Sequence, residues 1–224
     1  VMSEQVKVSE SIRLGTLLAF SGGFLDAYTF MTRDGTFANA ETGNIVRVGI
    51  YAALGEYGKS LYYMIPVIAF AIGIFVAVWF REKMNAMEKV HWKEAILLVE
   101  ILVLFMAGFM PQSMNPVVTS SIAFVCALQA QTFRSLRGMA FATTMCTGNL
   151  RSGTELLTMG SFEGNPGKKR KGLWYYWIDV TFALGGAAGA FLSRFFAERA
   201  VWISACVLIG AILFIECQKK KSEV

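Results

Sequence analysis

The tripeptide Thr42-Gly43-Asn44 occurs a second time in this chain, as Thr147-Gly148-Asn149. Threonine and asparagine carry hydrogen-bonding side chains and glycine adds backbone freedom, so the motif is unfavourable inside an apolar helix. We expect each copy to break the helix and to cap the short helix that follows it, Ile45 to Leu54 or Leu150 to Leu157. A helix that starts there directs free N–H groups and the positive end of its dipole at the adjoining space. Two such ends predict a binding site for a polar or negatively charged group.

An arginine follows each motif. Arg47 and Arg151 lie five and four residues after the motif threonines, within roughly the first turn of the expected helix. An arginine inside a membrane costs about 2.5–3.5 kcal/mol, so it is expected to face a cavity or a partner. Together with the two helix N-termini, the arginines would complete an anion site. The alternative is that they form internal ion pairs with Asp26, Glu41 or Glu155.

Asp26 and Gln129 occupy equivalent positions ahead of the two motifs. Residues 25–30 read Leu-Asp-Ala-Tyr-Thr-Phe and residues 128–133 read Leu-Gln-Ala-Gln-Thr-Phe, so a carboxylate in one half stands where the other half has an amide. A carboxylate in apolar sequence predicts a proton site, a cation site or a counter-ion. The predicted substrate-binding residues are Asp26, Thr42, Gly43, Asn44, Arg47, Gln129, Thr147, Gly148, Asn149 and Arg151.

The composition is typical of a membrane protein. Of the 224 residues, 55% are hydrophobic, which is too many to bury in one soluble core. Six runs approach the roughly 20 apolar residues that cross a bilayer. The polar start, residues 1–13, shows no signal-peptide pattern. The apolar runs are Leu14 to Met31, Leu61 to Phe80, Ala95 to Met110, Val117 to Phe133, Leu173 to Leu192 and Ala200 to Ile215.

The distribution of Lys and Arg distinguishes two topologies. If both motif stretches cross the bilayer, the chain has eight spans with ten Lys and Arg inside and nine outside, which is no bias. If residues 36–54 and 139–158 instead enter and return on the same side, six spans remain, with 16 Lys and Arg inside and five outside. The positive-inside rule therefore predicts six spans, two re-entrant segments and both termini in the cytoplasm.

Three spans per half would insert the two halves in opposite directions. Repeat 1 then covers about residues 14–110, and repeat 2 about residues 117–217, of a single membrane domain. Inverted repeats of this kind bring broken helices together near the middle of the bilayer, where transporters bind their solutes. The expected fold is an all-α integral membrane protein made of two inverted repeats of three transmembrane helices, each with a broken or re-entrant Thr-Gly-Asn segment.

The remaining side chains indicate no enzyme, metal site or cofactor. The four cysteines have no CxxC spacing, and the one histidine, His91, lies in a charged loop. Lys and Arg do not interleave with aromatic residues as they do on a nucleic-acid-binding surface. Gly185-x-x-x-Gly189 is a small-residue stripe typical of helix contacts, within the chain or between the copies of a homodimer.

Two stretches carry a resemblance to a known family. Gly23-Phe24-Leu25-Asp26-Ala27 with Phe37-Ala38-Asn39-x-x-Thr42-Gly43-Asn44 resembles the YoaK-type family of bacterial inner-membrane proteins (domain of unknown function 1275), and Leu128-Gln129-Ala130 with Ala142-Thr143-Thr144-x-x-Thr147-Gly148 agrees with it. The resemblance covers essentially the whole chain. It implies a multi-pass protein of the bacterial inner membrane and brings no particular activity. Glu41 departs from the family pattern, where an uncharged residue is expected, and Asn149 stands where threonine is common.

Two classes of function follow from these patterns. The first is a small secondary transporter or channel for a small anionic or polar solute, with its site at the paired Thr-Gly-Asn segments near the middle of the bilayer. The second is a membrane-embedded structural or regulatory protein, in which the motifs only hold the halves together. A polar cavity joining the two motifs would favour transport, whereas a fully packed centre would favour the second class. The expected partners are the lipid bilayer and the solute, with no nucleic acid.

Overall fold

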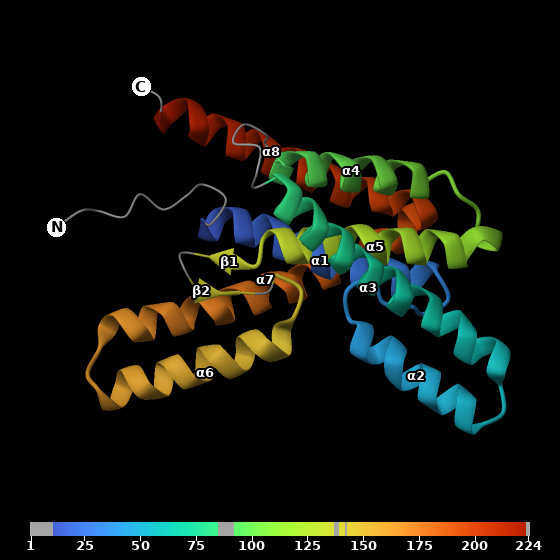
Figure 1. The fold of residues 1–224 in the computed structure, drawn as a ribbon, viewed down its shortest axis with the longest axis horizontal. Coiled ribbons are helices and arrows are strands. Elements are labelled where there is room, and N and C mark those ends of the chain that lie inside the picture. The colour runs from blue at the N-terminus through green and yellow to red at the C-terminus, as the bar shows by residue number, and fades with distance from the viewer. Residues whose placement is uncertain (1–10, 85–91, 137–138, 142, 223–224) are drawn as a thin grey trace.

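A computed structural model describes residues 11–84, 92–136, 139–141 and 143–222, which excludes His91 and the first ten residues. The described chain is almost entirely helical (Figure 1). Two-residue strands β1 (Ser135–Leu136) and β2 (Met139–Ala140) form one short antiparallel pair. The helices are α1 (Ile12–Thr32), α2 (Glu41–Ala53), α3 (Tyr57–Met84), α4 (Trp92–Ala107), α5 (Asn115–Thr132), α6 (Cys146–Phe162), α7 (Pro166–Phe196) and α8 (Val201–Ser222), with 3₁₀ turns η2 (Gln112–Met114) and η3 (Ala197–Ala200).

The long helices match the apolar runs of the sequence. Helices α1, α3, α4, α5, α7 and α8 run roughly along the long axis of the molecule, and α1 begins at the same end at which α8 finishes (Figure 1). By length and composition, three stretches of the described residues could cross a membrane, namely Tyr57–Lys83, Gln112–Thr132 and Pro166–Lys220. The last stretch includes both α7 and α8. The prediction of an all-α protein with membrane-compatible helices is confirmed.

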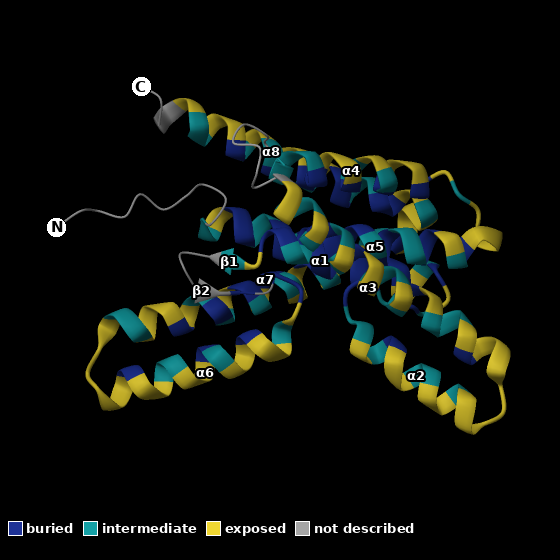
Figure 2. Cartoon of the chain, in the orientation of Figure 1, coloured by how far each residue is buried: buried dark blue, intermediate teal, exposed yellow. Residues whose placement is uncertain are grey.

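Apolar side chains cover the outside of the molecule as well as its core. The core surrounds α1 and α5, which carry more buried residues than the other helices, whereas α2 and α6 are largely exposed (Figure 2). Ile68 and Phe75 of α3 and Leu184 and Phe191 of α7 are all more than half exposed. A monomeric soluble protein rarely exposes so many large apolar side chains, whereas lipid covers them in a membrane.

The helices pack in a recurring pattern. Helix α1 packs against α7 and α8, and α5 packs against α3 and α4. Helix α2 packs against α3, and α6 against α7. Helix α4 packs against α8. Each contact between one of the helices α1 to α4 and one of the helices α5 to α8 therefore has a counterpart in which the two halves are exchanged.

Glycines allow α1 and α7 to approach closely. A Cβ atom added to Gly185 would collide with the carbonyl oxygen of Phe20, and one added to Gly189 would collide with that of Phe24. On the other side of the contact, a Cβ on Gly23 would meet the carbonyl of Phe182. The Gly185-x-x-x-Gly189 stripe is thus buried in a helix contact within the chain.

The motifs do not break the helices, which corrects the expectation from sequence. Helices α2 and α6 begin several residues before their predicted starts. Their first turns therefore contain the two motifs, Thr42-Gly43-Asn44 and Thr147-Gly148-Asn149. The N-cap residues are Ala40 and Met145, and neither makes a side-chain cap hydrogen bond. Irregular backbone instead precedes each helix, at residues 33–40 before α2 and at residues 143–145 before α6. The Thr and Asn side chains therefore do not cap these helices.

The polar groups ahead of α2 are stabilised by Asn44 of the motif and by Asp26 of α1, and not by a capping bond. Asn44 donates from Nδ2 to the Phe37 carbonyl over 2.9 Å and accepts the Phe37 N–H on Oδ1 over 3.2 Å. Asp26 of α1 accepts the next two backbone N–H groups. Because these side chains stabilise the irregular segment, the helix can start at Glu41, ahead of the glycine.

Candidate functional site

A cavity of about 500 Å³ lies where the N-terminal ends of α2 and α6 approach each other (Figure 1). Residues of both motifs line it, namely Thr42 from the first copy and Thr147 and Gly148 from the second. The other lining residues are Asp26 of α1, Asn39, Ala40 and Glu41 at the start of α2, Phe70 of α3, Thr144, Met145 and Cys146 at the start of α6, and Phe182 of α7. The two motifs, 105 positions apart in the sequence, thus share one cavity.

Asp26 connects the cavity to the segment before α2. Its side chain is 6% exposed, and Oδ1 accepts the backbone N–H groups of Ala38 at 2.9 Å and Asn39 at 2.7 Å. Hydrogen bonds to an ionised acceptor are roughly twice as strong as neutral ones. Asp26 therefore fixes the backbone that carries Asn39 and Glu41 into the cavity wall.

Three buried side-chain oxygens in the wall have no hydrogen-bond partner among the described residues: Asn39 Oδ1, Glu41 Oε1 and Thr144 Oγ1. Asn39 and Thr144 are only 5% and 6% exposed. The other polar atoms of two of these side chains are bound, because Asn39 Nδ2 donates to the Gly22 carbonyl at 3.1 Å and Glu41 Oε2 accepts from Asn44 at 3.0 Å. Buried polar atoms are nearly always paired, so three exceptions around one cavity indicate a place where a ligand or water would be bound.

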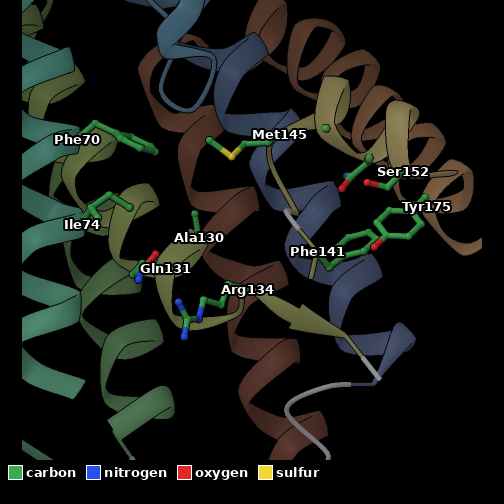
Figure 3. A pocket seen from close by; sticks show the side chains of 11 residues that line it. Phe70, Ile74, Ala130, Gln131, Arg134, Phe141, Met145, Ser152 and Tyr175 are labelled. Atoms are coloured by element: carbon green, nitrogen blue, oxygen red, sulfur yellow. The ribbon is translucent and has the colours of Figure 1, made fainter. Parts of the chain in front are cut away.

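A second cavity of about 400 Å³ adjoins the first. The two share Phe70, Met145 and Gly148 as lining residues. Figure 3 shows Phe70 and Ile74 of α3 on one side and Phe141, Ser152 and Tyr175 on the other, with Met145 and Arg134 between them. Asn149 of the second motif lines this cavity, and its Nδ2 donates to Asp179 of α7 at 2.9 Å.

Arg47 does not line either cavity, which corrects the predicted anion site. Its guanidinium donates to the carbonyl oxygen of Gly35 and lies over the rings of Phe30, Phe37 and Tyr63, at 5.6, 5.2 and 5.2 Å from their centroids. These contacts fasten the irregular segment 33–40 to α2 and α3. The reason is local: the Gly35 carbonyl and the rings of Phe37, of Phe30 in α1 and of Tyr63 in α3 give the arginine closer partners than the cavity does.

Arg151 also lies outside the shared cavity. It is exposed and lines a groove on α6 together with Thr147, Leu150 and Glu155. Within the described part of the chain, neither Arg47 nor Arg151 forms an ion pair, so the predicted pairing with Asp26, Glu41 or Glu155 is wrong as well. Neither arginine lines the shared cavity, and the groove that holds Arg151 shares only Thr147 with it.

Gln129 takes a different role from its counterpart Asp26. Its Nε2 donates to both carboxylate oxygens of Glu100 on α4, at 3.1 and 2.9 Å, and it does not line the shared cavity. Glu100 is fully buried. A buried carboxylate needs a hydrogen-bond donor, and Gln129 supplies it across the contact between α4 and α5.

Sequence reasoning missed the role of Arg33, whose side chain is 0% exposed. Its guanidinium donates to the Tyr28 hydroxyl, to Asn115 Oδ1 at 2.9 Å, and to the carbonyls of Ala107 and Met110, both at 3.1 Å. A cation at the carboxyl end of α4 also interacts favourably with the helix dipole. Because three of these partners are 74 to 82 positions away in the chain, no local pattern could have revealed them.

Apolar helices long enough to cross a membrane, packed beside a cavity with polar and apolar lining residues, are typical of a helical membrane protein. Within that class, the chain belongs to the family described as "Protein of unknown function (DUF1275)", whose model matches residues 14–214. The resemblance inferred from the two motif stretches is thereby confirmed. Neither the curated proteins nor the solved structures contain a match to this chain.

Proposed function

We propose that the protein is a small secondary transporter or channel that binds a small polar solute in the cavity between α2 and α6. The observation that carries the proposal is that both copies of the duplicated motif line one cavity, whose wall has three buried oxygens without a partner among the residues that the structure describes. A structural or regulatory protein would have no need for a cavity at this point and would be expected to have a packed centre. The cavity therefore favours the transport class.

The proposal includes an inverted repeat, α1 to α4 against α5 to α8. Exchanging the halves converts the contact of α1 with α7 into that of α5 with α3, and the contact of α1 with α8 into that of α5 with α4. It also converts α2 with α3 into α6 with α7 and leaves the contact of α4 with α8 unchanged. This agreement supports a pseudo-two-fold axis, which in inverted-repeat transporters passes close to the binding site.

Helices α2 and α6 are the proposed re-entrant elements. With 13 and 17 residues, they extend about 20 and 25 Å at 1.5 Å per residue, less than the roughly 30 Å of a hydrocarbon core. They extend from the shared cavity toward opposite ends of the molecule (Figure 1). Irregular backbone at membrane depth is tolerated where protein covers it or a cavity borders it, and residues 39–40 and 144–145 border this one.

We place the ends where α1 begins and α8 finishes in the cytoplasm of a bacterial inner membrane. The support is the positive-inside rule, because the basic stretch Lys168 to Lys171 at the start of α7 lies at that same end (Figure 1). A preference for anionic solutes loses its support, since Arg47 and Arg151 lie outside the cavity. The solute class is therefore narrowed to small polar molecules.

A larger side chain at position 148, which would fill part of the cavity, tests the proposed site. A Cβ added to Gly148 would meet no atom within 4 Å, and the residue lines both cavities. Gly148→Val should therefore fold and reduce cavity volume. Gly49→Val is the matched control, because Gly49 is also an exposed glycine of a short helix with open space around it, and it lines neither cavity.

The measurement is counterflow uptake of radiolabelled glycine, glycerol, ethanolamine and glycolate into proteoliposomes. We expect at least one solute to enter faster than into protein-free liposomes, with uptake lost in Gly148→Val and kept in Gly49→Val. Uptake no faster than in protein-free liposomes, or equal uptake by the two variants, would contradict the proposed function.

A further inference from the structure

The charged side chains that line the shared cavity are all negative. Asp26 and Glu41 contribute two carboxylates, and no Lys or Arg is among the lining residues. The N-termini of α2 and α6 each contribute about half a positive charge. With both carboxylates ionised, the cavity therefore carries about one net negative charge, which a single monovalent cation would balance.

The unpartnered oxygens indicate what kind of cation would fit. Asn39 Oδ1, Glu41 Oε1 and Thr144 Oγ1 are buried acceptors without donors among the described residues. Asn39 and Thr144 are at least nine-tenths buried and line the cavity, so their free oxygens are not solvated from elsewhere. A primary ammonium group carries three N–H donors and accepts none. It therefore has as many donors as the cavity wall has unpartnered acceptors.

The apolar part of the wall agrees with an organic cation. Phe70 of α3 and Phe182 of α7 line the cavity. Aromatic rings attract organic ammonium groups through the negative ring face, and they give a carbon chain an apolar surface to contact. A small solute with an ammonium group at one end would use the acceptors and the rings together.

We propose that this cavity binds the primary ammonium group of a small monocationic solute, with Glu41 and Asp26 as counter-charges and Asn39 and Thr144 as hydrogen-bond acceptors. The inference rests on the proposed function and names its solute class. Glu41 is the central residue, because its Oε1 has no partner whereas Asp26 already accepts two backbone N–H groups.

Three solutes of nearly equal size test the charge preference on the full-length protein in detergent. Ethanolamine carries an ammonium group, ethylene glycol is its neutral analogue and glycolate is its anionic analogue. A ligand that binds only the folded state raises the melting temperature. We expect ethanolamine to raise Tm and to bind at least about tenfold more tightly than the other two, and sodium chloride at equal ionic strength to leave Tm unchanged.

Substitutions assign the effect to the cavity. Glu41→Gln keeps an acceptor for Asn44 but removes the charge, and losing a hydrogen bond to a charged group corresponds to a Kd for ethanolamine raised about 10- to 100-fold. Glu155→Gln, which removes an exposed carboxylate on the outer groove of α6, should leave the Kd unchanged. Thr144→Val, nearly isosteric, should weaken ethanolamine binding about tenfold and serves if Glu41→Gln does not fold.

Several outcomes of these binding experiments would overturn the inference. Stronger stabilisation by glycolate, equal stabilisation by all three solutes, a sodium chloride effect equal to that of ethanolamine, or no stabilisation at all would remove the ammonium site. None of these decides the transport proposal, which the Gly148→Val uptake experiment tests by itself. Ethanolamine binding without uptake of any solute would keep the cation site and contradict transport.

Discussion

At the scale of residues, the duplicated motif borders the shared cavity, but neighbouring side chains supply its unpartnered oxygens. Asn39, Glu41 and Thr144 present the unpartnered oxygens, and each lies within three residues of a motif. Of the motif side chains themselves, Asn44 and Asn149 are engaged in internal hydrogen bonds. Thr42 and Thr147 line the cavity beside them.

Asp26 is expected to stabilise the segment before α2. Asp26→Ala removes the acceptor for the N–H groups of Ala38 and Asn39, and leaving them unsatisfied should lower the free energy of unfolding by about 3 kcal/mol. Asp26→Asn retains an acceptor oxygen and should cost less than half as much. Thermal or chemical unfolding in detergent measures both. Equal stability of wild type and Asp26→Ala would show that these bonds contribute nothing.

The two arginines are expected to differ in their effect on stability. Arg47→Met loses the bond to Gly35 and three ring contacts, which should lower the free energy of unfolding by about 1–3 kcal/mol. Arg151→Met, at an exposed position of α6, should change it by less than about 0.5 kcal/mol. Neither should alter solute preference. A changed Kd in Arg47→Met with an unaltered Tm would return this arginine to the binding site.

At the scale of elements, close contacts between helices hold α2 and α6 in place. Helix α7 packs against α1 through glycines and also packs against α6. Helix α3 packs in the same way against α5 and α2, with Gly73 next to the Phe124 carbonyl. The long helices thus position the two short ones, whose own buried residues are few.

Gly185 tests this contact. Gly185→Ala would force a methyl group against the Phe20 carbonyl, and overpacking of this kind typically costs about 1–3 kcal/mol. Gly210→Ala is the matched control on α8, where an added Cβ meets nothing within 4 Å and the higher helix propensity of alanine should stabilise by up to about 1 kcal/mol. The melting temperatures should therefore move in opposite directions. A lower Tm in both variants would assign the effect to the loss of glycine itself.

At the scale of the whole molecule, the turn between α2 and α3 and the turn between α6 and α7 lie at opposite ends (Figure 1). This arrangement agrees with two short helices that enter a membrane from opposite faces. It also separates Lys59 from the basic stretch Lys168 to Lys171, as the positive-inside rule requires of a six-span topology.

Single-cysteine labelling tests the topology. In a background lacking Cys126, Cys146, Cys206 and Cys217, an impermeant thiol reagent should reach a cysteine at position 58 in intact cells. It should reach a cysteine at position 168 only after the membrane is permeabilised. Labelling at position 58 only after permeabilisation would restore the eight-span alternative.

The sequence by itself determined the class and the family, and its repeated motif pointed to the region that borders the shared cavity. Apolar run lengths identified the long helices, because crossing a bilayer imposes a minimum length on local sequence. The paired motifs identified the family and pointed to the region that borders the cavity. Both inferences depend on patterns that are local in the chain or repeated along it.

Only the tertiary structure decided which side chains enter the cavity. The chain turns before each short helix, so the motifs lie in the first helical turns, and Arg47 bonds to Gly35 and nearby rings while Glu41 and Thr144 line the cavity. Gln129 pairs with Glu100, and Arg33 with groups 74 to 82 positions away. Hydrogen bonds to distant backbone and side chains fix these orientations, and such partners are chosen by packing between helices, which has no signature in local sequence.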